Sequence, residues 1–273
     1  MTILQAIILG ILQGLTEFLP ISSSGHLVIL PFFLNWQLPE KEMFIFNVLV
    51  QVGTMVAVII FYWKDLIAII SDFFKQLFQG TPFATTNARL GWLLIIATVP
   101  AGLAGLLLQD LVESAFTSPL FAGIALIITA LLMFLGERIS QRTGDIEDIT
   151  ILEALFMGLM QSLALFPGIS RSGATISGGM MRHLRREAAG KFSFLMAVPI
   201  MLAAGGLSTY QMVTEVPDLM SFLPIMVVGF FTALIVGYVA IRWLLRFLVK
   251  NSMVYFSIYC LLLGITSILF TVL

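Results

Sequence analysis

Long apolar runs dominate the chain, and six of them are long enough to cross a membrane as helices. A spanning helix needs about 20 mainly apolar residues. A further run at 65–79 places charges around an apolar face, which is typical of a helix lying at the membrane interface. The pattern predicts an all-α integral membrane protein whose six spanning helices cover 43–63, 88–108, 119–136, 190–211, 221–242 and 252–272.

Two other apolar stretches are interrupted by polar segments. Residues 3–34 contain a break at 20–26, and residues 151–181 contain a break at 167–173. Clusters of Pro, Gly and Ser interrupt helices, and the pieces on either side of each break are too short to cross a bilayer alone. The sequence therefore predicts two re-entrant helix-turn-helix hairpins, whose turns must be buried in protein or line a water-filled cavity.

The two hairpins match each other without a gap. One constant shift along the chain aligns Gln13 with Gln161 and Ser22 with Ser170, and it also aligns several apolar residues. Apolar residues coincide easily by chance, whereas matched Gln, Ser and Gly residues are harder to dismiss. We expect an internal duplication within a single transmembrane domain over 1–273, with a first repeat over 1–138 and a second over 149–273.

The number of spans between the hairpins sets their relative direction. A re-entrant hairpin returns to its own side of the membrane, and three spans separate the first hairpin from the second. The second hairpin must then enter from the opposite side. The halves are accordingly predicted to be inverted repeats related by a pseudo-two-fold axis in the membrane plane, with the two turns meeting tip to tip.

Charge in the loops orients this arrangement. The loops that hold Asp110 and Glu113, and Glu215 and Asp218, carry no Lys or Arg. Cytoplasmic loops are enriched in Lys and Arg. Both termini and the first hairpin are therefore expected outside, and the acidic residues of 137–148 in a solvated loop. The groups expected to be cytoplasmic are Lys64, Lys75 and Arg89; Arg138 and Arg142; Arg182, Arg185, Arg186 and Lys191; and Arg242, Arg246 and Lys250.

Composition supports the membrane assignment and excludes one class of partner. Of the 273 residues, 59% are hydrophobic and 11% are charged, and the mean hydropathy is +1.05. A soluble domain needs more charge to cover its surface. The formal net charge is -1 and no basic stripe is present, so no nucleic-acid partner is expected. The bilayer itself is the predicted environment.

The first break combines an acid with hydroxyl groups and an imidazole. Gln13 and Glu17 are four residues apart and share one helix face, and Ser22, Ser23, Ser24, Gly25 and His26 follow. An ionisable side chain at membrane depth is costly and marks a functional site. His26 is a candidate base, proton donor or nucleophile. An adjacent Ser could be a nucleophile that His26 activates. Gln51, inside a span, is expected to hydrogen-bond to another helix.

The second break contains a cation. Ser170, Arg171, Ser172, Gly173 and Thr175 form a polar segment that opens a short helix. A guanidinium in an apolar environment needs an anion and matches phosphate oxygens in bidentate fashion. A structural ion pair with the carboxylate of the first break is the alternative explanation for this charge.

Both breaks are predicted to present helix N-termini to the membrane interior. Free amides and the positive end of the helix dipole favour an anion there. Gln13 and Glu17 add hard oxygen ligands, which suit Mg²⁺ or Ca²⁺ bridging to a phosphate. The sequence therefore predicts a site for a phosphate-bearing substrate between the two turns.

At these residues the sequence resembles undecaprenyl-diphosphate phosphatases of the bacitracin-resistance type. The resemblance rests on residues 13–26 and 167–175 and extends over the whole chain in length, span order and duplication. It implies a multi-pass protein of the bacterial inner membrane. It also implies hydrolysis of a polyprenyl diphosphate lipid, undecaprenyl diphosphate, to undecaprenyl phosphate and inorganic phosphate, which recycles the carrier lipid for cell-wall synthesis.

The resemblance also implies roles for individual residues. Glu17, Ser23, His26 and Arg171 would be catalytic, with Ser23 and His26 competing as nucleophile and base. Gln13 and Glu17 would hold the divalent cation; Gln13 stands where the family has an acid or Gln, so Glu17 carries most of that role. The implied substrate-binding residues are Ser22, Ser24, Gly25, Ser170, Ser172, Gly173 and Thr175.

A secondary transporter or flippase for a polyprenyl phosphate lipid is the alternative function, because inverted repeats with broken helices are typical of transporters. The oligomeric state stays open, with a homodimer as one candidate. The outer face is the expected side on which the site opens, because the hairpin with Glu17 and His26 enters from there.

Overall fold

The computed structural model describes residues 1–116, 118–215 and 219–273, and within these ranges it contains helices and no strand. The side chains of 40–42, 113, 215, 219 and 221 also fall outside the description. Three of the acidic residues used above to orient the loops, Glu113, Glu215 and Asp218, belong to these undescribed positions. The all-α prediction is confirmed for the described part of the chain.

Within the described ranges, six helices have the length and apolar composition of membrane spans. They agree with the six predicted segments, and α10 and α11, two of the three in the second half, extend further toward their charged ends. α10 and α11 gain this length because Arg and Lys residues are good helix formers at the end of an apolar run. The spans are α3 (Glu40–Phe61), α5 (Thr86–Leu107), α7 (Pro119–Ile139), α10 (Arg186–Glu215), α11 (Leu223–Lys250) and α12 (Val254–Val272).

The helix between the first two spans, α4 (Trp63–Phe78), is amphipathic as predicted. It exposes Trp63, Ile67 and Phe74 on one side. Short elements complete the connections: α6 (Gln109–Ala115), η1 (Ile146–Asp148) and η2 (Leu219–Phe222).

The two interrupted stretches form helix-turn-helix hairpins, α1 (Ile3–Phe18) with α2 (Ser23–Phe33) and α8 (Ile151–Leu163) with α9 (Arg171–Met181). α1 begins with a capping box between Thr2 and Gln5, and α8 begins with one between Thr150 and Glu153. Such boxes satisfy amides that a helix start leaves without partners. The interrupted helices are confirmed, while their re-entrant placement in a bilayer stays a prediction.

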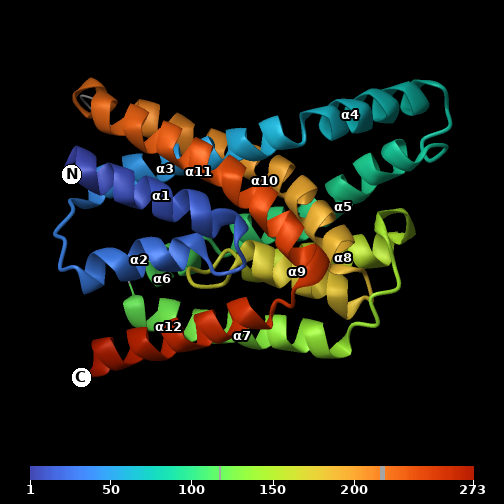
Figure 1. The fold of residues 1–273 in the computed structure, drawn as a ribbon. Helices are drawn as coiled ribbons and strands as arrows, with labels where there is room; N and C mark the ends of the chain where they lie inside the picture. The colour runs from blue at the N-terminus through green and yellow to red at the C-terminus, as the bar shows by residue number, and fades with distance from the viewer. Residues whose placement is uncertain (117, 216–218) are drawn as a thin grey trace.

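The hairpins occupy opposite ends of the helix bundle (Figure 1). The α1–α2 hairpin lies at the end where both termini are found, and the α8–α9 hairpin lies nearer the other end. Their turns meet between them: the Ser172 hydroxyl donates to the Leu19 carbonyl at 3.2 Å. A Cβ added to Gly25 would stand 3.0 Å from the Cα of Gly168. The predicted tip-to-tip meeting of the turns is confirmed.

Glycines let each hairpin pack closely on a span. A Cβ on Gly10 of α1 would lie 3.1 Å from the carbonyl oxygen of Gly229 in α11. A Cβ on Gly158 of α8 would lie 3.0 Å from the carbonyl carbon of Ala97 in α5. Small residues let membrane helices approach at backbone distance. Gly10 and Gly158 occupy equivalent positions in the two hairpins, and each lets its hairpin pack closely against a spanning helix.

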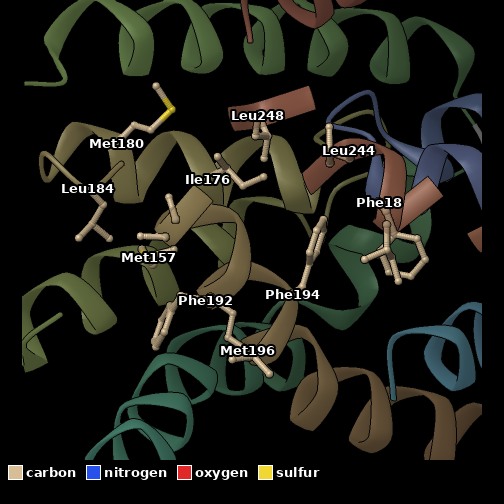
Figure 2. Close-up of a cluster of buried hydrophobic side chains, with 14 of the residues drawn as sticks. Phe18, Met157, Ile176, Met180, Leu184, Phe192, Phe194, Met196, Leu244 and Leu248 are labelled. Atoms are coloured by element: carbon tan, nitrogen blue, oxygen red, sulfur yellow. The ribbon is translucent and has the colours of Figure 1, made fainter. Parts of the chain in front are cut away.

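Large apolar side chains fill the space behind the turns (Figure 2). Phe18, at the end of α1, meets Phe194 of α10 edge to face, with ring centroids 5.6 Å apart. Met157 of α8, Ile176 of α9 and Leu244 of α11 are fully buried in the same cluster. The ends of the interrupted helices are thus held by a close-packed core and not by lipid contact alone.

A buried carboxylate ties together the end of the bundle opposite the termini. Glu137 was expected in a solvated loop, but it is 8% exposed. Both of its oxygens accept from Arg186 at 2.7 Å, and it also accepts from Arg142 and the Met253 amide. The expectation was wrong because Arg186 and Met253 lie far from Glu137 in sequence. This carboxylate joins α7, α10 and the start of α12.

Close packing at Gly158 gives a testable consequence. Gly158→Ala should lower the free energy of unfolding by about 1–3 kcal/mol, because the new methyl group overlaps the α5 backbone. Gly206→Ala is the matched control, since a Cβ there has no neighbour within 4 Å. Thermal unfolding in detergent measures both. Equal shifts in Tm for the two variants would contradict the packing described here.

Candidate functional site

A cavity of about 640 Å³ lies where the two turns meet. The turns supply its polar wall, and apolar residues of α3, α5 and α10 supply most of the rest. A largely apolar cavity with a few converging polar groups is the usual form of a small-molecule site. The residues contributed by the two hairpins are Thr16, Glu17, Ser22, Ser23, Ser24, Ala164, Leu165, Ile169, Ser170 and Arg171.

Glu17 is the centre of the polar wall. One oxygen, Oε2, accepts from the Ser23 hydroxyl at 2.7 Å and from Gln13 Nε2 at 3.0 Å. The other, Oε1, accepts from Arg171 Nη2 at 3.1 Å. The Glu17 side chain is 10% exposed and that of Arg171 is 13% exposed. The structural ion pair considered above therefore exists, and it joins the two hairpins.

The ion pair leaves polar atoms unused. A carboxylate can only accept, so Gln13 must present its amide nitrogen to Glu17. The other amide atom, Gln13 Oε1, is buried without a hydrogen-bond partner among the described residues, and Arg171 Nη1 is in the same state. Buried polar atoms without partners are costly. One free oxygen acceptor and one free cationic donor therefore flank Glu17.

The first turn is built around Ser22. Its hydroxyl accepts from the Gly25 amide at 3.2 Å and so caps α2. Its backbone has φ of 70°, a conformation uncommon for a residue with a side chain. Residues held this way cluster at functional sites. The cap uses one first-turn donor and leaves the amides of Ser23 and Ser24 without intrahelical acceptors.

The second turn repeats this cap with different support. The Ser170 hydroxyl accepts from the Gly173 amide at 3.1 Å. Thr129 of α7 holds the turn, because its hydroxyl donates to the Gly168 carbonyl at 3.1 Å and accepts from the Ser170 amide at 3.0 Å. Gly168 has φ of 96°, which favours glycine. Thr175 pairs with the hydroxyl of Ser193 and is fully buried.

His26 does not line the cavity. Its Nδ1 lies 2.7 Å from the Ser22 carbonyl, and its Nε2 lies 2.7 Å from the hydroxyl of Tyr259. A carbonyl only accepts, so for neutral His26 the proton is on Nδ1 and Nε2 accepts from Tyr259. The two rings are parallel to within 2°. His26 thus braces the Ser22 turn, and Tyr259 of α12 is a contact that sequence reasoning missed.

The structure divides the candidate residues into two groups. Of the residues predicted for the site, those that line the cavity are Glu17, Ser22, Ser23, Ser24, Ser170 and Arg171. Those behind this wall are Gln13, Gly25, His26, Ser172, Gly173 and Thr175, and all of these are buried. Gln51, expected to bond to another helix, instead faces the cavity. No pattern in the sequence indicates that this face of α3 is open.

The donor set fits a hard divalent cation better than a transition metal. Among the described residues no group of three His, Cys, Asp or Glu side chains converges. Gln13 Oε1 and the Glu17 carboxylate supply oxygen atoms, and Gln13 Oε1 has no hydrogen-bond partner within the described ranges. Mg²⁺ is commonly bound by one or two carboxylates together with water and substrate phosphates. The residues present are compatible with such an ion.

The cavity extends toward the end of the bundle that holds both termini. Gln109 and Val112 of α6, and Gln211 near the end of α10, belong to its lining. α6 follows directly on the C-terminal end of α5 and lies in the half of the bundle where the termini are found (Figure 1). This is the end that loop charge predicts to be outside.

Known proteins are similar in sequence to this chain over nearly its whole length. A family model described as "Bacitracin resistance protein BacA" matches residues 6–266. A protein of Chlorobium phaeobacteroides (strain BS1) named undecaprenyl-diphosphatase is 41% identical, with 97% of this chain and 95% of the relative covered. Proteins of the same name from Methanosphaera stadtmanae and Thermomicrobium roseum are 37% and 39% identical, and each match covers 98% or more of both chains.

Thiol labelling tests the cavity and its direction. In a Cys260→Ala background, Ser208→Cys should react with a membrane-impermeant maleimide both in detergent and in intact cells, because Ser208 lines the cavity. Ser267→Cys is the matched control and should stay unlabelled, since Ser267 is fully buried. Labelling of Ser208→Cys in detergent but not from outside the cell would contradict an outward opening.

Proposed function

This chain belongs to the bacitracin resistance protein BacA family, and on that premise we propose that it hydrolyses undecaprenyl diphosphate to undecaprenyl phosphate and inorganic phosphate. The observation that carries the proposal is the contact of Ser23 with Glu17 at 2.7 Å, beside Arg171 and inside one cavity. One wall of the cavity then holds a nucleophile, Ser23, a base, Glu17, and a cation that can bind phosphate, Arg171.

Ser23 is the proposed nucleophile and Glu17 its base. The Ser23 hydroxyl already donates to Glu17 Oε2, so its proton passes to that oxygen as Oγ attacks the terminal phosphorus. The bond from phosphorus to the bridging oxygen breaks, and undecaprenyl phosphate leaves. Water then attacks the phosphoserine, Glu17 returns its proton to Ser23 Oγ, and the water's protons leave with inorganic phosphate. This is covalent catalysis with a positioned base.

Arg171 and the turn amides stabilise the charge that the reaction moves. Arg171 Nη2 is held by Glu17, and Nη1 has no partner among the described residues. Nη1 is therefore available to an equatorial phosphoryl oxygen, while the free amides of Ser23 and Ser24 lie at the positive end of α2. Electrostatic stabilisation by preorganised donors is usually the largest single contribution to catalysis, and phosphoryl transfer depends on it together with positioning.

His26 acts through position in this proposal. Its ring is occupied on both nitrogens, by the Ser22 carbonyl and by the Tyr259 hydroxyl. A base must reach the proton that it removes, and Ser23 donates to Glu17 instead. His26 and Tyr259 hold the Ser22 turn so that Ser23 stays within reach of the carboxylate.

Mg²⁺ or Ca²⁺ is the proposed cofactor, held by Gln13 and Glu17. When bound, such an ion would neutralise charge on the diphosphate oxygens. The support is the unused Gln13 Oε1 atom beside a carboxylate.

The same proposal covers the membrane placement. The protein lies in the bacterial inner membrane with both termini outside, and the hairpins are re-entrant parts of two inverted repeats. Matching capping boxes and matching close-packed glycines support the duplication. A transporter without enzymatic activity is not favoured. Such a protein needs only to bind its lipid, and binding does not require a Ser hydroxyl that donates to a buried carboxylate, as Ser23 does to Glu17.

Substitution at Ser23 and His26 tests the nucleophile. In detergent with added Mg²⁺ or Ca²⁺, the wild type should release phosphate from a polyprenyl diphosphate, and Ser23→Ala should lose about 10³-fold or more of that rate. His26→Ala should lose about 10²-fold, because the turn shifts while Ser23 remains. A trapped phosphoenzyme should be acid-stable phosphoserine. Acid-labile phosphohistidine, or full activity in Ser23→Ala, would contradict the assignment.

Arg171 tests the phosphate contact. Arg171→Lys should reduce kcat about 10²-fold, because an ammonium cannot hold Glu17 and a phosphoryl oxygen in the fixed fork of a guanidinium. Arg182→Lys is the matched control: Arg182 pairs with Glu153 at 2.7 Å on the surface, away from the cavity. Steady-state phosphate release measures both. A kcat for Arg171→Lys equal to that of the control would rule out the proposed contact.

A further inference from the structure

Gly102 of α5 differs from the glycines at close helix contacts of the bundle. On other helix contacts, a Cβ added to Gly14, Gly53 or Gly264 would fall within 3.0 Å of backbone atoms. A Cβ added to Gly102 of α5 or Gly206 of α10 would meet nothing within 4 Å. Gly102 therefore does not serve close packing, and it leaves open space beside the cavity that it lines.

The open space at Gly102 leads to a groove on the outside of the bundle. The groove has a volume of about 370 Å³ and is lined by Ile95, Thr98, Val99, Gly102, Leu103 and Pro199. Gly102 also lines the cavity that holds Glu17 and Arg171. The wall that separates cavity and groove at this point thus contains a residue without a side chain.

The groove is apolar and faces the lipid. Ile95, Val99 and Leu103 are 46%, 49% and 55% exposed on a helix of membrane-spanning length. Thr98 contributes the one side-chain polar atom, and its hydroxyl already donates to the Leu94 carbonyl at 2.7 Å. An occupant of the groove therefore finds no free side-chain donor and a single hydroxyl acceptor. It must be hydrocarbon, because a polar group buried there would lose its hydrogen bonds to water.

The course of the groove matches that of a lipid chain. Between Gly102 and Ile95, α5 runs back from the cavity toward its own N-terminus for about 10 Å, at 1.5 Å per residue. That direction leads away from α6 and the predicted outer end, into the depth of the bilayer. A chain attached to a headgroup at Arg171 would leave the cavity at Gly102 and join the surrounding acyl chains.

We propose that the groove between α5 and α10 binds the first isoprene units of the substrate's polyprenyl chain, and that Gly102 is the opening through which the chain leaves the catalytic cavity. The proposal rests on the proposed phosphatase function and extends it to chain-length preference. Pro199, which lacks a backbone N–H, forms the opposing wall on α10.

Filling the opening should change substrate preference. Gly102→Leu should lower kcat/KM for undecaprenyl diphosphate relative to methyl diphosphate by about tenfold or more, since an alkyl group of one carbon does not reach the groove. Gly206→Leu is the matched control, because Gly206 has open space but lines neither cavity nor groove. The ratio should stay at the wild-type value in that variant. An unchanged ratio in Gly102→Leu would overturn the proposal.

A binding measurement separates failure of this proposal from failure of the phosphatase assignment. A polyprenyl monophosphate with a diazirine on its first isoprene units should crosslink to residues 95–103, and unlabelled polyprenyl diphosphate should compete. Gly102→Leu should reduce the crosslink and Gly206→Leu should not. If the crosslinks that unlabelled lipid suppresses fall on α11 or α12 in place of α5, the proposed groove is wrong. This conclusion holds whether or not the protein releases phosphate.

Discussion

The ion pair between Glu17 and Arg171 is the contact on which the meeting of the two hairpins depends. It links the end of α1 to the start of α9, and each side chain comes from a segment too short to cross a bilayer alone. Replacing a buried ion pair by apolar residues is often neutral or stabilising. Stability alone is therefore a weak reason for the pair. Two buried atoms beside its hydrogen bonds, Arg171 Nη1 and Gln13 Oε1, have no partner in the described part of the chain and are available to a ligand.

Everything around the pair keeps its backbone fixed. Ser22 and Ser170 cap the two inner helices, Thr129 ties the second turn to α7, and the Phe18–Phe194 contact closes the core behind α1. Groups that act on a transition state must be held within a fraction of an ångström. The bundle supplies that rigidity with side chains drawn from spans in both halves.

The sequence predicted most of the fold because its signals are local. Apolar run length locates the spans, and the breaks at 20–26 and 167–173 are visible as Pro, Gly and Ser. The misjudged features depend on partners distant in sequence. His26 and Tyr259 are 233 residues apart, and Glu137 meets Arg186 and Met253 across three helices. A single sequence carries no signal for such pairs, so His26 could not be distinguished from a base facing the cavity.

The two turns have matching caps but carry different charged residues. In the first turn, Glu17 occupies a position whose counterpart in the second hairpin is Leu165. In the second turn, Arg171 stands opposite Ser23. Each half thus carries one charge of the pair and neither carries both. A hairpin with its own charge alone would bury an unpaired ion, which is strongly unfavourable. Assembly of the two halves is therefore what makes the charged site tolerable within the bilayer, and the site exists only where the halves meet.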